Sequence, residues 1–136
     1  MAGIRTLSTI LIAALQFAWL PAQATEIPMD TAVLRALDKV SARVSTLRAP
    51  VGVPIAFGRL EITAQRCLAR PPEETPESSV LLDIYKQLGD TPREQVFHGW
   101  MFASSPDLSA MEDAVYDVWV LRCENSVASS SPGDNG

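Results

Sequence analysis

Hydrophobic and polar residues alternate with a period of two along much of this chain, the pattern typical of half-buried β-strands. Val40, Ala42, Val44 and Thr46 form one such alternation, which predicts that these four residues share the buried face of a strand. The same period, or a short apolar run between turn residues, recurs further along the chain. We therefore expect strands at residues 40–46, 60–65, 80–85, 96–102 and 115–123.

Three segments complicate this pattern. Residues 31–39 would suit one or two helical turns or the opening of a strand, and nine residues are too few to decide. Cys67 lies on the polar parity of its strand, so either a bulge near residues 65–66 shifts the phase or the strand ends there. In residues 96–102 both alternating faces are apolar or small, which predicts a central strand covered on each side.

Short strands with little helix favour a mainly β fold, either a small antiparallel β-barrel or a sandwich. Residues 69–79 and 86–93 are expected to form a loop and a turn, and residues 108–113 could hold one helical turn. An immunoglobulin-type sandwich does not fit the pattern. That fold places tyrosine two residues before its second cysteine, where this chain has Leu121 before Cys123.

The first 24 residues have the three parts of a secretory signal: Arg5, an apolar run, and the sequence Ala-Gln-Ala. We expect cleavage between Ala24 and Thr25, and the alternative is an uncleaved N-terminal anchor. The expected organisation is a signal peptide at 1–24, a leader at 25–33, a single β domain at 34–124 and a disordered tail at 125–136. The exported protein would be periplasmic, with no membrane span after signal cleavage.

Both cysteines, Cys67 and Cys123, would remain in the exported chain. Two cysteines in an oxidising compartment most often pair, and this bridge would contribute about 4 kcal/mol through the unfolded state. A redox-active pair, two free buried thiols and an intermolecular bond are the alternatives, although the C-x-x-C spacing of redox pairs is absent. We expect one intramolecular structural disulfide.

Charge and composition limit the classes of function. The chain has 136 residues, enough for one domain, with 11 Lys and Arg against 16 Asp and Glu and a net charge of -5. This balance argues against binding to nucleic acid or to anionic lipid. The sequence has no glycine-rich phosphate-binding motif, and we expect no cofactor.

Candidate catalytic residues are few. His98 is the one histidine, and its position within a strand favours a hydrogen-bonded core or edge side chain over catalysis. No ligand spacing suggests a metal site. Asp113 and Asp117 belong to an acidic stretch, and paired carboxylates could in principle cleave glycosidic bonds.

Two segments could contact a partner instead. Residues 70–77 form an acidic, proline-rich loop, and Trp100 and Phe102 would make a binding patch if their side of the strand faces solvent. The residues expected at the partner-binding face are Arg70, Pro71, Pro72, Glu73, Glu74, Glu77, Trp100, Phe102, Ser104, Ser105 and Pro106.

The strings R-P-P-E-E-T-P-E at residues 70–77 and G-W-M-F-A-S-S-P at 99–106 are specific. Together with L-D-K-V at 37–40 and Y-D-V-W at 116–119, they resemble the alphaproteobacterial family called domain of unknown function 2155, over residues 34–123. The resemblance implies an exported envelope protein whose two cysteines belong to the family pattern. Because the family is uncharacterised, the resemblance implies no activity.

Our leading hypothesis is a non-catalytic periplasmic module that binds or scaffolds an envelope protein or another envelope component. The alternatives are a small envelope hydrolase that uses carboxylates, and an apolar-ligand carrier with an unfilled barrel interior. The sequence does not determine the oligomeric state.

Overall fold

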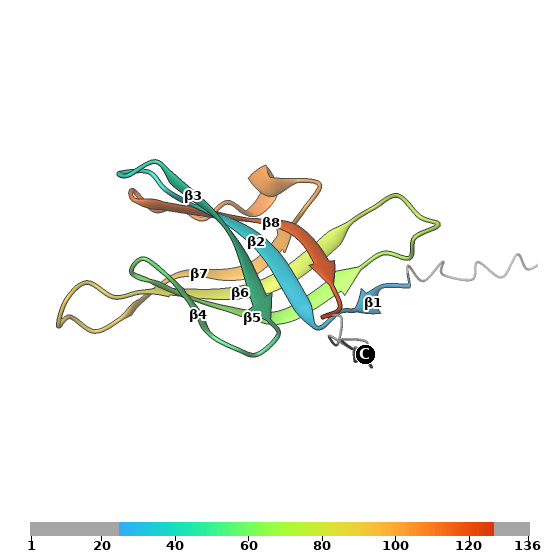
Figure 1. The fold of residues 1–136 in the computed structure, drawn as a ribbon, viewed down its shortest axis with the longest axis horizontal. Helices are drawn as coiled ribbons and strands as arrows, with labels where there is room; N and C mark the ends of the chain where they lie inside the picture. The colour runs from blue at the N-terminus through green and yellow to red at the C-terminus, as the bar shows by residue number, and fades with distance from the viewer. Residues whose placement is uncertain (1–24, 127–136) are drawn as a thin grey trace, which may run out of the picture.

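The computed structural model describes residues 25–126, so the predicted signal peptide and residues 127–136 of the predicted tail lie outside the described residues. The described chain forms two antiparallel sheets that pack face to face, with β2, β3 and β8 lying across β5, β6 and β7 (Figure 1). The elements are β1 (Ile27–Pro28), β2 (Thr31–Asp38), β3 (Arg43–Pro50), β4 (Ile55–Phe57), β5 (Leu60–Ala69), β6 (Ser78–Lys86), β7 (Glu94–Phe102), the 3-10 helix η1 (Pro106–Ser109) and β8 (Tyr116–Glu124).

Sheet A has the strand order β1-β5-β6-β7, with β4 also paired to β5, and sheet B has the order β3-β2-β8. Neither sheet closes on itself, so the mainly β prediction is confirmed and the fold is a sandwich. The predicted leader at 25–33 contributes β1 and the first three residues of β2. Asn125 and Ser126, the first residues of the predicted tail, form hydrogen bonds with Asp30.

Alternate residues of both sheets point into one core, as the period of two requires. The predicted alternation in residues 60–65 is confirmed, because Leu60, Ile62 and Ala64 are all buried. Sheet B faces them with the inward residues of β2 and β8. These sheet B core residues are Ala32, Leu34, Ala36, Val118 and Val120.

The first predicted strand has the wrong boundaries and the wrong buried face. Residues 31–38 form β2, and Val40 lies in the turn after it with 80% of its surface exposed. Val44 is 55% exposed in β3, whose inward positions are instead Ser45, Leu47 and Ala49. The outward residues of β3, Val44, Thr46 and Arg48, are exposed to solvent, so a valine among them carries no information about the core.

A bulge brings each cysteine to the inner face. The β5–β6 register shifts between Ala64 and Arg66, which returns Cys67 to the buried side, so the bulge alternative is confirmed. In β8 the register against β2 skips Leu121. As a result Cys123 points inward. Trp119 lies on the same parity but before the shift, and it does not belong to the core.

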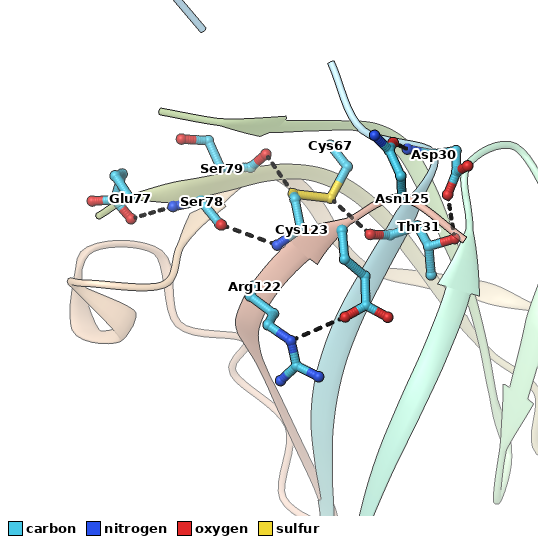
Figure 2. Close-up of a disulfide and its surroundings, with 10 residues drawn as sticks. Asp30, Thr31, Cys67, Glu77, Ser78, Ser79, Arg122, Cys123 and Asn125 are labelled. Atoms are coloured by element: carbon cyan, nitrogen blue, oxygen red, sulfur yellow. Dashed lines mark hydrogen bonds and ion pairs between the residues drawn. A yellow bond between two sulfur atoms is a disulfide. The ribbon is translucent and has the colours of Figure 1, made fainter. Parts of the chain in front are cut away.

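The disulfide between Cys67 and Cys123 joins β5 of sheet A to β8 of sheet B, with 5.7 Å between the Cα atoms (Figure 2). This confirms the predicted pairing. Both residues are buried, and the backbone N–H of Cys123 donates to the hydroxyl of Ser78 at 3.0 Å. The bridge joins two residues that are 56 positions apart in the sequence, and it links the two sheets covalently at one end.

The prediction that residues 96–102 form a central strand is wrong, because β7 is the last strand of sheet A. Met101 and Phe97 point toward the core, whereas His98 is exposed and Trp100 and Phe102 are half-buried. The apolar residues on the second side of β7 therefore do not pack under another layer. They form part of an outer surface, which is described below.

Gly58 lies in the tight turn between β4 and β5 at a φ of +57°. A Cβ atom at this position would lie 2.5 Å from the hydroxyl oxygen of Tyr116, which accepts a hydrogen bond from the backbone N–H of Arg59. Tyr116 is buried and packs edge-on against Phe57, so its ring has no free space to move into.

Removing the disulfide should reduce stability strongly. We expect the double variant Cys67→Ala and Cys123→Ala to lose about 4 kcal/mol of unfolding free energy, because its unfolded chain is no longer cross-linked. Urea unfolding of the oxidised protein and the variant measures the difference. A loss below about 1 kcal/mol would contradict a structural role for the bridge.

Gly58→Ala and Gly89→Ala form a matched pair, because both glycines have a φ near +60° and only Gly58 faces a neighbour. We expect Gly89→Ala to cost about 1 kcal/mol from backbone strain. Gly58→Ala should cost about 3 kcal/mol, since overpacking against Tyr116 adds to the same strain. Thermal and urea unfolding of both variants measures these losses, and equal losses would rule out the steric contribution.

Candidate binding surfaces

The outer face of sheet A holds a compact, mostly apolar patch built from two cross-strand rows. Arg66, Leu81 and Trp100 are aligned across β5, β6 and β7, and Leu68, Ser79 and Phe102 are aligned in the next row. Their inward neighbours in sequence fill the core, so these side chains face away from it. We call these six residues the aromatic face.

A hollow of about 230 Å³ lies in the aromatic face, lined by Leu68, Ser79, Trp100 and Phe102, with Glu26 at its margin. Ser79 is itself buried, so the small serine side chain lies at the floor of the hollow and the larger side chains surround it. Two aromatic rings and a leucine around a recess form the kind of surface that accepts an apolar group of a partner.

A polar network lies beside the aromatic face on the outer side of sheet A. His98 pairs with Asp83 across β6 and β7, and Gln65 donates to the same carboxylate at 2.9 Å. The hydrogen bond with His98, followed by that from Gln65, holds the pKa of Asp83 below its usual value despite partial burial. His98 is thus an edge residue held by a hydrogen bond, one of the two positions expected for it.

Glu77 connects the two segments that were expected to form the partner-binding face. Its carboxylate accepts from the backbone N–H and the hydroxyl of Ser104, and from the N–H of Ser78 at 3.0 Å. Burial raises the pKa of Glu77, but these hydrogen bonds outweigh burial and leave it below its ordinary value. The proline-rich loop is therefore fastened to the turn that follows β7.

The remaining residues of the expected face are spread over the loop and the turn. Pro72, Glu73 and Glu74 are exposed in the loop, and no ion pair joins these two glutamates to another described residue. Ser105 donates its N–H to the carbonyl of Phe102, and Pro106 begins η1. The structure thus joins Glu77 to Ser104 and Trp100 to Phe102, but it gathers no single pocket from all eleven residues.

The acidic stretch before β8 has a structural explanation. Asp113 pairs with Lys86 at 2.7 Å and accepts from the backbone N–H groups of Val115 and Tyr116. Its side chain is 8% exposed, and burial raises its pKa, yet the bonds from Lys86, Tyr116 and Val115 lower the pKa overall. A general acid needs the opposite shift, so Asp113 is poorly suited to that role.

Asp117 lines a second cavity of about 260 Å³ between β8 and η1, together with Pro106, Asp107, Ala110, Val118 and Trp119. Asp113 does not line this cavity, so the two carboxylates considered for a hydrolase do not share it. No group of three or more His, Cys, Asp or Glu residues within 25–126 is placed to hold a metal ion.

Sequence reasoning missed Leu68 and Leu81 in the aromatic face. Leu81 lies in the apolar run of residues 80–82, in which inward and outward positions look alike. Leu68 faces outward because of the bulge before Cys67, and sequence left that bulge undecided. A firm bulge assignment would have placed Leu68 on the outer face of its strand.

This architecture defines a disulfide-linked β-sandwich with an apolar outer face on its larger sheet. The chain belongs to the family described as "uncharacterized protein conserved in bacteria" (DUF2155), whose profile matches residues 32–123 and thus includes both cysteines. The family resemblance inferred from the motifs is confirmed.

The chain is also similar to an uncharacterized protein of Rickettsia prowazekii (strain Madrid E), with 26% identity over 88 residues. The match covers 65% of this chain and 57% of that relative's length. A comparison with solved structures found no match. Within residues 25–126, no helix has the length and apolar character needed to span a membrane.

The ion pair of Asp113 should contribute stability in a pH-dependent way. At pH 7 we expect Asp113→Asn to cost about 2 kcal/mol, the scale of hydrogen bonds to a charged group. A carboxyl whose pKa is lowered on folding stabilises the protein above its unfolded pKa of about 3.9, and this contribution is lost as the pH falls through the folded value.

Urea unfolding of the wild type and Asp113→Asn at pH 7, 5 and 3 measures this contribution. The difference between the two proteins should persist at pH 5 and shrink toward pH 3, since the other carboxyl groups titrate in both proteins and cancel. A difference that does not change with pH would show that the charge of Asp113 is not responsible.

Proposed function

We propose that this protein is an exported, non-catalytic module of the bacterial envelope, and that it binds a protein or another envelope component through the aromatic face. The observation that carries the proposal is the hollow lined by Trp100, Phe102 and Leu68 on the outside of sheet A. Buried hydrophobic side chains already fill the core, so these aromatic rings are not needed to complete it. Tryptophan is among the residues most enriched at the energetic centres of protein interfaces, which lie in well-packed, desolvated pockets.

The N-terminal segment and the disulfide support export. Residues 1–24 have the sequence of a secretory signal, and the Cys67–Cys123 bridge is of the kind that persists in oxidising compartments. Within the envelope, the fastened loop adds a second feature to the binding region. Glu77 holds this loop to Ser104, two residues beyond Phe102, so the loop is ordered before any partner arrives and less entropy is lost on binding.

The alternative functions have weaker support. A carboxylate hydrolase would use an acid with a raised pKa, whereas Asp113 has a lowered pKa and a structural partner in Lys86. An apolar-ligand carrier would use a barrel interior, and the two sheets of this sandwich do not close into a barrel.

Photo-cross-linking in living cells tests the aromatic face directly. A photoreactive phenylalanine analogue replaces Phe102 in the full chain, and the same analogue at the exposed Val44 of sheet B serves as the control. We expect a discrete adduct from position 102 and none from position 44. An amine-reactive cross-linker aimed at Lys86 would be a poor substitute for the photoreactive residue. The Lys86 side chain is 13% exposed and paired with Asp113.

Trp100→Ala then measures the contribution of the hollow. It should reduce the yield of the position-102 adduct about tenfold, the effect of losing one central aromatic residue in an interface. Circular dichroism must show that the variant is folded. Equal adducts from positions 102 and 44, or none from either, would reject the aromatic face as the binding surface.

A further inference from the structure

A second surface lies on the other sheet, along the outer edge of β8. Sheet B has only three strands, and β8 is its last strand beside η1. Within residues 25–126, the backbone hydrogen bonds outside regular strand pairing include none from Asp117, Val118 or Trp119. An edge strand directs alternate N–H and C=O groups away from its sheet, so this stretch can pair with another strand.

The cavity of about 260 Å³ lies against this edge rather than over one face of the sheet. Asp117, Val118 and Trp119 are consecutive in β8 and all line it, although consecutive strand residues point to opposite faces. A cavity in contact with all three must therefore border the backbone of the strand. Residues of η1 and its C-terminal flank, among them Asp107, form the opposite wall.

A second cavity lies further along the same strand, lined by Leu121 and Arg122 of β8 and by residues from the loop before β6 and the turn after β7. The backbone N–H of Cys123 is bonded to Ser78, so the open part of the edge ends before it. The two cavities lie along the same strand, beside residues 117–119 and 121–122, and we call them together the edge groove. At about 3.3 Å per residue, roughly six residues of an extended chain would fill it.

Charge in the first cavity of the edge groove indicates which side chain can occupy it, whereas Arg122 and Glu77 of the second cavity are engaged with Glu124 and Ser104. Asp107 and Asp117 both line the first cavity, no Lys or Arg lines it, and no described ion pair engages either carboxylate. Trp119 adds an indole ring, which attracts a cation over its face. Two carboxylates and an indole around one cavity complement a guanidinium or ammonium group on an apolar stem.

We propose that the edge groove binds an extended, basic segment of a protein partner, which adds a fourth strand to sheet B beside β8. An arginine or lysine side chain of this segment occupies the cavity between Asp107, Asp117 and Trp119. Backbone pairing supplies affinity, and the cationic side chain sets the register. This site lies beside sheet B and shares no residue with the aromatic face, while Glu77 and Ser104, which fasten the proline-rich loop, line its second cavity.

The probe is a synthetic peptide of eight residues in which valine and threonine alternate around one central arginine. The matched peptide carries citrulline, which has nearly the same shape as arginine without its charge. A third peptide has N-methylated backbone groups, which prevent strand pairing. Binding to the full chain is measured by fluorescence anisotropy, and the contact surface is mapped by amide chemical-shift changes.

We expect the arginine peptide to bind about tenfold more tightly than the citrulline peptide, and the N-methylated peptide not to bind. Amide shifts should concentrate at residues 117–122 and 106–110. Asp117→Asn should weaken the arginine peptide severalfold and leave the citrulline peptide unchanged, whereas Asp90→Asn, the same charge change in an exposed turn, should alter neither.

Three results would overturn the proposal. They are no saturable binding of the arginine peptide at millimolar concentration, equal affinity for the arginine and citrulline peptides, and shift changes away from β8. Asp117→Asn removes only a charge from a partly exposed residue, so we expect the variant protein to fold normally. An unchanged amide spectrum of the core residues verifies this.

Discussion

The inter-sheet disulfide is the constraint on which the rest of this structure depends. Cys67 can reach Cys123 only if both side chains point between the layers, and each strand achieves this with a bulge two residues or fewer before its cysteine. The bulges reverse the alternation of β5 and β8 at that point. The same change of phase turns Leu68 outward, so the covalent link and the composition of the outer surface have one structural cause.

Core packing then determines which large side chains remain for binding. The facing residues of the two sheets are mostly small or branched aliphatic residues, with Phe57 and Tyr116 as the buried aromatics at one end. Trp100, Phe102 and Trp119 lie on other faces, half-buried among neighbours. A small sandwich that leaves such large aromatic rings outside its core retains apolar surface suited to association.

Sequence patterns predicted the strand-rich fold, the disulfide and the β5 alternation. They failed where the chain lies at a sheet edge. Val44 and the apolar residues of β7 resemble core residues in sequence, yet strand order, which no local pattern encodes, places both strands at edges. The carboxylates near β8 were equally ambiguous, because only the fold brings Lys86 to Asp113 and separates Asp113 from the cavity that holds Asp117.

The two proposed binding surfaces belong to different sheets, and this separation bears on what the module can do. The aromatic face offers apolar contact on the broad side of sheet A, whereas the edge groove offers backbone pairing and negative charge along sheet B. The two proposed surfaces differ in chemistry and would select different partners. The disulfide fixes the two sheets relative to one another, so a partner on each would be held at a defined separation. Rigid spacing of two partners is a scaffolding function that needs no catalytic residue.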